Sequence, residues 1–343
     1  MNTIIEKLDG QNNKIHALEK AADLIKNGSV VAFPTETVYG LGANGLDEEA
    51  CKKIFDVKRR KRDNPLILHV TNDEMVRNLS SEITEDQKKL MDNLWPGPLT
   101  IIFKKSDKVN DVVSCGGNTV AIRNPSDEIA RFLIDKSNCP IAAPSANKSG
   151  RPSPTNAQDV YSDMKGEIEM ILDGGSCNIG IESTVVDLTE KPYTILRPGF
   201  YTKEDLEEYL EEVVYDKSLI DSNTVPKSPG QKYKHYAPKT KLIVIKGNMD
   251  NIQSYVNSLG INTDEIGFIL CEETATNVNF ENVKIISKRN DYLNFAHNIF
   301  SYLRELDKLN YKLLICEGVN EQKMGISIMN RLKKSCANNI EVI

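Results

Sequence analysis

The stretch VVAFPTETVYGLGANGLDEEACKKIF occupies residues 30–55 and joins a strand, a glycine-rich segment and a helix. Its first six residues form a short apolar run with two adjacent valines, which predicts a buried strand. Asp47 is a suitable N-cap for a helix within DEEACKKIF. Outward from this stretch, apolar runs alternate with helical patterns as far as about residue 212, which is typical of an α/β domain.

The elements expected in this domain are read from apolar runs and helical periodicity. The expected strands span residues 30–35, 66–70, 100–105, 119–125, 139–144, 169–175, 183–188 and 194–199. The expected helices span residues 14–27, 47–55, 84–94, 126–136, 155–164 and 202–212.

Beyond this domain the composition changes twice. Residues 216–240 contain three prolines and few aliphatic side chains, which predicts a linker without a core. After the linker, the runs KLIVI, EIGFIL, VKIIS and YKLLICEG predict strands. Residues 291–309 form an amphipathic helix, and a last helix follows Gly325. The alternation predicts a second, smaller α/β unit of the doubly wound kind.

The bulk composition is that of an ordinary globular protein of 343 residues, with a formal net charge of −6. A chain of this length favours about two domains and can bury a core without disulfides. The seven cysteines form no CxxC pair, and the four histidines are too scattered for an HExxH zinc site. The N-terminus lacks the apolar core of a signal peptide, and no apolar run approaches about 20 residues. We therefore expect a cytoplasmic protein without a membrane span.

GLGANG at residues 40–45 matches the G-x-G-x-x-G pattern of dinucleotide sites. Six residues separate it from Phe33, whereas the glycine turn of such a site follows its strand directly. Where an acid should bind the ribose, about 20 residues on, stands the basic run KRRKR. We therefore favour glycines that shape a loop. A nicotinamide-dependent dehydrogenase stays an alternative.

KRRKR places five cations in a row at residues 58–62. Such runs are usually solvated faces or phosphate patches. This run lies between a helix and a strand, and a bound polyphosphate would relieve the repulsion between its charges. Phosphate binding is therefore favoured. A non-catalytic RNA-binding module remains a second alternative.

Polar loops follow several of the expected strands, where ligands bind in α/β sheets. PSANKSGRPS (144–153) suits phosphate or a small zwitterion. PTETVYGLG (34–42), GIEST (180–184) and LRPG (196–199) add hydroxyls and an arginine. KYKHYAP (232–238) interleaves cations and aromatic rings that could stack on a base, or simply dock the linker on a domain. No GxxxxGK[ST] or GxSxG motif is present, so neither a P-loop nor a nucleophile elbow is indicated.

Taken in order, PTETVYGLG, the basic run leading into DNPLILHV, PSANKSGRPSPT, ESTVVDL and LRPG resemble the YrdC-like domain of threonylcarbamoyl-AMP synthases. The likeness covers about residues 10–205, and SPGQKYKHYAPK and GISIMNRL are similar to the long, two-domain form. The resemblance implies a YrdC-like twisted mixed sheet with helices, plus a smaller Rossmann-like α/β domain. The corresponding ranges are a catalytic domain at 1–212, a linker and active-site lid at 213–240, and a C-terminal domain at 241–343.

The resemblance also implies an activity, a nucleotidyl transfer that converts L-threonine, bicarbonate and ATP into threonylcarbamoyl-AMP and pyrophosphate. This is the first step of tRNA threonylcarbamoyladenosine modification. The residues that would hold threonine are Thr37, His69, Arg123, Ala143 and Ser183. Those that would hold ATP are Lys58, Arg60, Asn64, Thr119, Ser145, Ser153 and Arg197, with His235 and Tyr236 closing over the nucleotide.

Lys58 and Arg60 are the implied catalytic residues. The family tends to read K-x-R-P here, whereas Lys61 replaces the proline and Arg59 and Arg62 add charge. The chemistry suits such a site, because phosphoryl and nucleotidyl transfers depend mainly on positioning and charge neutralisation.

The remaining expectations concern cofactor and partners. Mg²⁺ is expected with ATP. The expected partners are a separate tRNA threonylcarbamoyl transferase complex and a weak contact with tRNA, with no membrane. Residues 241–343 contain no evident chemical cluster, so the sequence assigns that unit no role.

Overall fold

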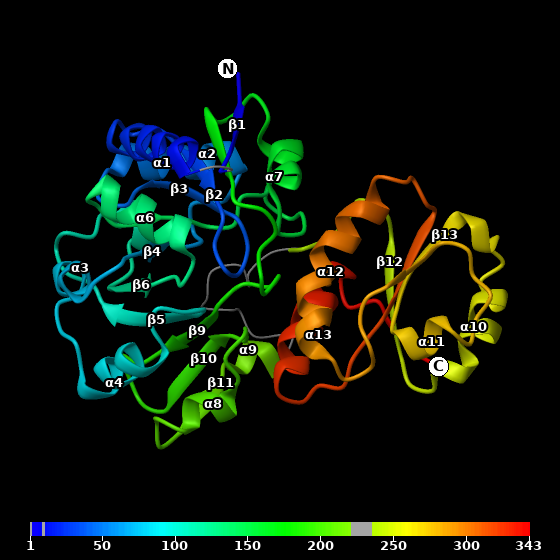
Figure 1. Cartoon of the computed structure of the whole chain (residues 1–343). Helices are drawn as coiled ribbons and strands as arrows, with labels where there is room; N and C mark the ends of the chain where they lie inside the picture. The colour runs from blue at the N-terminus through cyan, green and yellow to red at the C-terminus, as the bar shows by residue number, and fades with distance from the viewer. Residues whose placement is uncertain (1, 9–10, 221–234) are drawn as a thin grey trace. The chain divides into compact units, whose positions relative to one another are not determined.

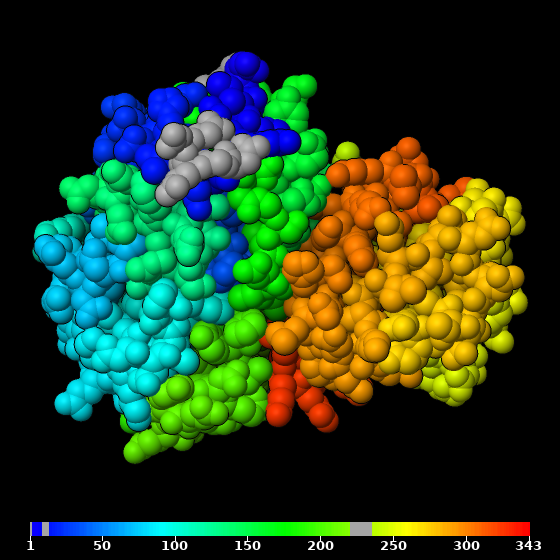
Figure 2. Space-filling view, in the orientation of Figure 1, coloured from blue at the N-terminus to red at the C-terminus, as the bar shows by residue number. Residues whose placement is uncertain are grey.

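The computed structural model describes residues 2–8, 11–220 and 235–343. The chain forms two compact units, residues 1–149 with 153–232, and residues 150–152 with 233–343. Each unit has its own sheet with helices packed against it (Figure 1). In the space-filling view, blue to green atoms belong mainly to the first unit and yellow to red atoms to the second (Figure 2).

The first unit contains a mixed sheet, as expected. Its strands are β1 (Ile4–Lys7), β2 (Val31–Phe33), β3 (Gly40–Asn44), β4 (Ile67–His69), β5 (Leu99–Lys104), β6 (Thr119–Arg123), β7 (Ile141–Ala142), β8 (Met170–Asp173), β9 (Thr184–Asp187), β10 (Tyr193–Arg197) and β11 (Val213–Tyr215). Among the described residues their order in the sheet is β1-β8-β2-β3-β7-β4-β6-β5-β9-β10-β11. The pairs β4–β6 and β5–β9 are parallel, whereas β4–β7 and β5–β6 are antiparallel.

The helices of the first unit are α1 (Gln11–Lys26), α2 (Glu48–Lys58), α3 (Asp73–Leu79), α4 (Glu85–Leu94), α5 (Asp111–Ser114), α6 (Glu128–Ser137), α7 (Ala157–Met164), α8 (Lys203–Glu207) and α9 (Lys217–Ile220). One face of the sheet packs against α2, α3, α4, α7 and α8 in the main core. On the other face, α1 and α6 lie side by side over β2, β7 and β8 (Figure 1).

The rest of that second face carries a different kind of surface. Side chains alternate between faces along a strand, so Leu68, Ile101 and Ile122 point into the main core, and their neighbours point the other way. A small apolar cluster there contains only strand residues, namely Ile67, Ile102, Ala121, Val185 and Leu196. This part of the sheet, from β4 to β10, is where the candidate site lies.

The glycine-rich segment was expected to be a loop, and this expectation was wrong. Gly40–Asn44 is strand β3, which pairs antiparallel with β2 and β7. A Cβ on Gly42 would lie 2.6 Å from Phe33 Cε1 and 2.7 Å from Ile141 Cγ2. The glycine is therefore needed for close packing inside the sheet, and the segment is not the strand-to-helix turn of a dinucleotide site.

The range 213–240, expected as a linker, contains regular structure at its start. β11 pairs with β10, so the first sheet continues into this range, and α9 follows it. Residues 221–234, half of the expected linker and lid, lie outside the described residues. The described part resumes at His235.

The second unit is a parallel α/β unit, which confirms the smaller Rossmann-like domain. Its strands are β12 (Leu242–Lys246), β13 (Ile266–Leu270), β14 (Val283–Ile285), β15 (Leu313–Glu317) and β16 (Ile340–Val342), in the order β14-β13-β15-β12-β16 among the described residues. Its helices are α10 (Ile252–Ser258), α11 (Glu272–Ala275), α12 (Tyr292–Asp307) and α13 (Met324–Ser335), with 3₁₀ turns at Met249–Asn251 and Thr263–Glu265. Within the described ranges, no helix has the length and apolar character needed to cross a bilayer.

Candidate active site

The strand registers place four polar side chains in one row across the first sheet. His69 on β4 lies opposite Arg123 on β6, and Arg123 lies opposite Thr100 on β5. Thr100 lies opposite Val185 on β9, which in turn lies opposite Arg197 on β10. Residues paired in this way point to the same face of a sheet. The row therefore lies on the face that carries the small apolar cluster.

Ser183, directly before β9, ties this row together. Its hydroxyl lies 2.8 Å from Thr100 Oγ1, and Arg197 Nη2 donates to it at 3.0 Å. Arg197 Nε also donates to the Ser183 carbonyl at 3.0 Å. Both arginine bonds fix the guanidinium, and all three side chains are buried. The contacts form a rigid polar corner at one end of the row.

A buried ion pair joins Arg123 to Glu36 from the PTETVYGLG segment. The distance from Arg123 Nη2 to Glu36 Oε1 is 2.8 Å, and the two side chains are only 5% and 7% exposed. The alignment is nevertheless not that of a hydrogen bond. Both oxygens of Glu36, and Nε and Nη2 of Arg123, are buried without a hydrogen-bond partner among the described residues. Such groups cost free energy until a ligand or water satisfies them.

His69 is held as a neutral imidazole beside this pair. Burial lowers the pKa of His69 to about 3, with a further contribution from the nearby positive charges of Arg123 and Arg197. Its Nδ1 lies 3.3 Å from the carbonyl of Ile141. A neutral ring next to two arginines does not repel them, so it can contact a small polar substrate without adding charge.

We expect this buried histidine to make the first unit sensitive to acid. In the unfolded chain a histidine binds its proton near pH 6.5, whereas the folded protein resists protonation until the pH approaches 3. The stabilisation is therefore complete above about pH 6.5 and is lost as the pH falls, by about 3 kcal/mol between pH 7 and pH 4. The free energy of unfolding, measured with urea at several pH values, should depend less steeply on pH in His69→Gln between pH 7 and pH 4. The exposed His16→Gln is the control, and an unchanged slope in His69→Gln would contradict the assignment.

The basic run divides into buried and exposed cations. Asp47 caps α2, and its side chain accepts from the backbone N–H groups of Glu49 and Ala50. Lys58 is the last residue of α2 and is only 2% exposed. The run then leaves the helix at Arg59, which has left-handed backbone, and the chain exposes Arg59, Lys61 and Arg62 while half-burying Arg60.

Lys58 and Arg60 connect the basic run to the polar loops. Lys58 Nζ donates to the carbonyl of Ser145 and, at 2.6 Å, to that of Asn147. Arg60 donates through Nε to the Asn64 carbonyl and through Nη2 to the Pro65 carbonyl, each at 3.2 Å. The PSANKSG loop therefore lies directly against the end of α2. Lys58 therefore contacts the loop that contains Ser145, and the roles of Lys58 and Arg60 toward ATP stay predictions.

A cavity of about 280 Å³ opens on the same face of the first sheet. Thr119 lines it, and Thr119, Ala121 and Arg123 alternate along β6, so they share a face. Its other lining residues are Pro65, Ile102, Lys104, Asn118, Ala121, Asp187, Thr189, Glu190 and Leu196. Apolar side chains from the small cluster thus form one wall, and polar groups surround the mouth.

Three further expected residues of the first unit are buried, namely Thr37, Ala143 and Ser153. Thr37 Oγ1 donates to Thr35 Oγ1 at 2.9 Å, since Thr35 Oγ1 itself donates to the Val38 carbonyl. The N–H of Ala143 donates to the Ile67 carbonyl at 3.0 Å, beside β4. Ser153 Oγ donates to Glu182 Oε1 at 2.6 Å.

His235 and Tyr236 belong to the second unit. The Tyr236 ring stacks on Phe300 of α12 with centroids 5.1 Å apart, and the Arg331 guanidinium lies 5.9 Å from the same ring. Tyr236 is 3% exposed and has a backbone φ of 62°. The structure thus docks the end of the linker on the second unit, and the role of these two residues as a cover for the nucleotide stays a prediction.

Comparison with known proteins shows which family the chain belongs to. A family model described as "Telomere recombination", of the Sua5, YciO and YrdC proteins, matches residues 23–199. A second, described as "Threonylcarbamoyl-AMP synthase, C-terminal domain", matches residues 201–337. The threonylcarbamoyl-AMP synthase of Pyrococcus abyssi is 44% identical, with 92% of each chain covered. The chain belongs to the threonylcarbamoyl-AMP synthase family. The synthase of Bacillus subtilis is 40% identical, with 94% of each chain covered.

A solved structure agrees with the family over the whole chain. The crystal structure of Pyrococcus abyssi Sua5 complexed with L-threonine is 39% identical in sequence and superposes with a TM-score of 0.90, covering 100% of both chains. The two-domain architecture described above is therefore that of the long threonylcarbamoyl-AMP synthases.

Three residues that the sequence did not single out contact the expected site residues. Glu36 pairs with Arg123, Thr100 joins the row through Ser183, and Glu182 accepts from Ser153. Glu36 and Glu182 are each flanked by expected site residues in PTETVYG and GIEST, which was the available signal. Thr100 gave none, because a threonine in an apolar strand is an ordinary β-former.

Replacing Thr100 by valine should test the polar corner with little change in shape. We expect activity to fall about fivefold, because Ser183 loses a buried partner worth roughly 1 kcal/mol. The KM for threonine should rise while the KM for ATP stays the same. Thr194→Val, whose hydroxyl bonds locally to the Pro192 carbonyl on β10, is the control. Equal effects of both substitutions on the KM for threonine would contradict a role for Thr100 in the site.

Proposed function

We propose that this chain makes threonylcarbamoyl-AMP and pyrophosphate from L-threonine, bicarbonate and ATP. The observation that carries this proposal is the buried polar row on the sheet face that also carries the cavity. The family assignment gives the activity, and the row offers partners for a small zwitterion next to cations suited to a triphosphate.

Threonine would bind across the Glu36–Arg123 pair. A guanidinium matches a carboxylate in a bidentate way, and Glu36 can accept from the substrate ammonium. Atoms of both groups are buried without a hydrogen-bond partner among the described residues, so a zwitterion that bonds to both would offset their desolvation. Thr37, His69, Ala143 and Ser183 would enclose the side chain, whose hydroxyl needs a polar partner to be distinguished from valine.

ATP would bind along the same sheet face, between the basic run and the cavity. Lys58 and Arg60 would contact the phosphates together with Ser145, Ser153, Asn64 and Arg197. Thr119 and the apolar wall of Ile102, Ala121 and Leu196 would hold the base and sugar. The three exposed cations of the basic run would contribute only long-range attraction.

The reaction then needs positioning and charge neutralisation rather than a protein nucleophile. The neutral threonine amine attacks the carbon of bicarbonate-derived carbon dioxide, forming a C–N bond and releasing a proton. The resulting carboxylate attacks the α-phosphorus of ATP, a P–O bond forms, and the bond to pyrophosphate breaks. Lys58 and Arg60 would stabilise the charge on the leaving pyrophosphate. The enzyme class would therefore be nucleotidyltransferase.

Mg²⁺ would accompany the ATP. The described residues contain no group of three or more His, Cys, Asp or Glu side chains arranged for a metal. Mg²⁺ would therefore be held mainly by the substrate phosphates and by water, which is its usual mode of binding in nucleotide sites. When bound, the ion would neutralise phosphate charge.

The wider setting is also proposed. The labile product would pass to a separate complex that transfers the threonylcarbamoyl group to tRNA, with at most a weak tRNA contact here, in the cytoplasm. A lid over the site would limit hydrolysis of the carbamate. Half of its expected range, 213–240, lies outside the described part of the chain.

The activity is tested by pyrophosphate release from ATP with one substrate omitted at a time. We expect release that requires both L-threonine and bicarbonate, because the nucleophile is their adduct. L-valine should replace threonine poorly. Release at an unchanged rate without either compound would contradict the proposed reaction.

A further inference from the structure

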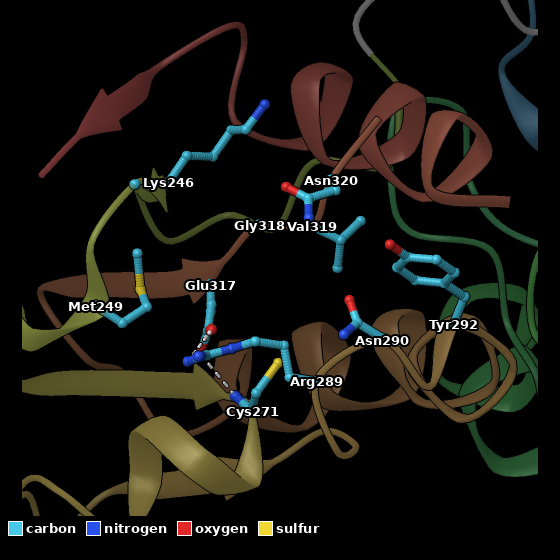
Figure 3. A pocket seen from close by; sticks show the side chains of 11 residues that line it. Lys246, Met249, Cys271, Arg289, Asn290, Tyr292, Glu317, Gly318, Val319 and Asn320 are labelled. Atoms are coloured by element: carbon cyan, nitrogen blue, oxygen red, sulfur yellow. Dashed lines mark hydrogen bonds and ion pairs between the residues drawn. The ribbon is translucent and has the colours of Figure 1, made fainter. Parts of the chain in front are cut away.

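The second unit contains a cavity of about 160 Å³ for which no role has been given so far. Its wall is formed at the carboxyl ends of β12, β13 and β15, by Lys246, Cys271 and Glu317 (Figure 3). The other lining residues come from the segments that follow the strands, including the first residues of a 3₁₀ turn and of α12, namely Gly247, Met249, Arg289, Asn290, Tyr292, Gly318, Val319 and Asn320.

The topology places this cavity where doubly wound sheets bind ligands. β13 and β15 are neighbours, but β13 connects onward to β14 on one side, and β15 connects to β16 on the other. Adjacent strands whose connections leave in opposite directions create a crevice at their carboxyl ends. Cys271 directly follows β13 and Glu317 ends β15, so both lie at this crevice.

A buried carboxylate forms the floor of the cavity. Glu317 is 3% exposed, and its Oε2 accepts from the Cys271 N–H at 2.9 Å. Its Oε1 faces Arg289 Nη2 at a long distance of 3.4 Å. Burial raises the pKa of the Cys271 thiol to about 12, so this neighbour stays neutral. Since a carboxylate can accept about four hydrogen bonds, Glu317 retains capacity for a cationic or hydroxyl group.

Positive charge and further polar groups surround the same space. Arg289 is about half exposed and uses Nη2 for Thr274 and Glu317, and the described residues provide no hydrogen bond for its Nε or Nη1. Lys246, paired with Glu321, lies on one side of the cavity, and Asn290 and Tyr292 lie on the other (Figure 3). An anionic group could thus be bound by Arg289 while a donor faces Glu317.

We propose that this cavity binds a small zwitterion, an α-amino acid, with its ammonium on Glu317 and its carboxylate on Arg289. A carboxylate and a guanidinium with unused donors match the two charges of that class. The volume is below the roughly 300–1,000 Å³ of sites for drug-sized ligands, which favours a molecule of amino-acid size over a nucleotide. This site is independent of the reaction proposed for the first unit.

The test is calorimetric titration of the full-length chain with each of the twenty amino acids and with inorganic phosphate. The same titrations are made with Glu317→Gln and with Arg289→Gln, which alters a half-exposed side chain and should leave the fold intact. We expect at least one amino acid whose affinity falls about tenfold or more in both variants, as charge-assisted hydrogen bonds are lost. Binding of threonine by the first unit should be the same in all three proteins.

The matched control is Glu265→Gln, because Glu265 pairs with Lys312 at the opposite end of the same sheet. It should leave every affinity unchanged. If no amino acid binds in a way that depends on both Glu317 and Arg289, the proposal is wrong. Binding of phosphate alone, dependent on Arg289 but not on Glu317, would identify an anion site and would equally overturn it.

Discussion

Lys58→Met is expected to lower kcat about 10²- to 10³-fold while leaving the chain folded. The lysine is buried at the end of α2, and its ammonium group lies between the carbonyls of Ser145 and Asn147. Removal of one preorganised charge-stabilising group from a reaction site typically costs this much in rate. The measurement is pyrophosphate release at saturating threonine and bicarbonate, with circular dichroism to confirm folding.

The free energy of unfolding should fall only modestly in Lys58→Met. Two buried carbonyls lose a donor, which costs about 1–3 kcal/mol, whereas a typical domain has 5–15 kcal/mol of stability. Arg62→Met is the control within the same basic run, because Arg62 is exposed and paired only at the surface with Asp56. If Arg62→Met impaired turnover as strongly as Lys58→Met, the run would act through overall charge, and the specific role of Lys58 would be wrong.

Arg123→Gln is expected to raise the Kd for threonine about 100-fold or more, because it removes the proposed partner of the substrate carboxylate. It should also destabilise the fold by about 3 kcal/mol, since Glu36 is then left as an uncompensated buried charge. Threonine titration by calorimetry and urea unfolding measure the two effects separately.

The double variant Glu36→Gln with Arg123→Gln separates binding from stability. Removing both partners of a buried ion pair often changes stability little. The free energy of unfolding of the double variant should therefore be close to that of the unchanged chain. Threonine binding should stay lost. Glu82→Gln, at the exposed Glu82–Lys104 pair, is the control for both measurements. Recovery of threonine binding in the double variant would show that the pair serves only the fold.

The alternation of strands and helices could be predicted from sequence because core strands and amphipathic helices have distinct periods. β3 could not, because Gly40–Asn44 has no β-branched side chain. Its glycines are needed only where Phe33 and Ile141 pack against them. Short edge elements such as β1 and β16 were missed for a related reason, since they bury few apolar side chains and carry weak patterns.

The parts of the candidate site that could be predicted are those whose polar and charged side chains are close together in the sequence. The basic run and the PSANKSG loop are visible in sequence, and the structure places Lys58 against that loop. The Glu36–Arg123 pair and the contact of Thr100 with Ser183 depend on strand order and register, which the sequence alone does not reveal. The same holds for the cavity of the second unit, whose residues come from separate strand ends.

The central claim, that the first unit joins threonine, bicarbonate and ATP in one pocket, is tested most directly by mass spectrometry of the product. The reaction is run with ATP, L-threonine and carbon-13 bicarbonate. We expect a threonylcarbamoyl-AMP ion that carries the heavy carbon, at greatly reduced yield with Lys58→Met or Arg123→Gln. A product of AMP or ADP without threonine and without the labelled carbon would contradict the account.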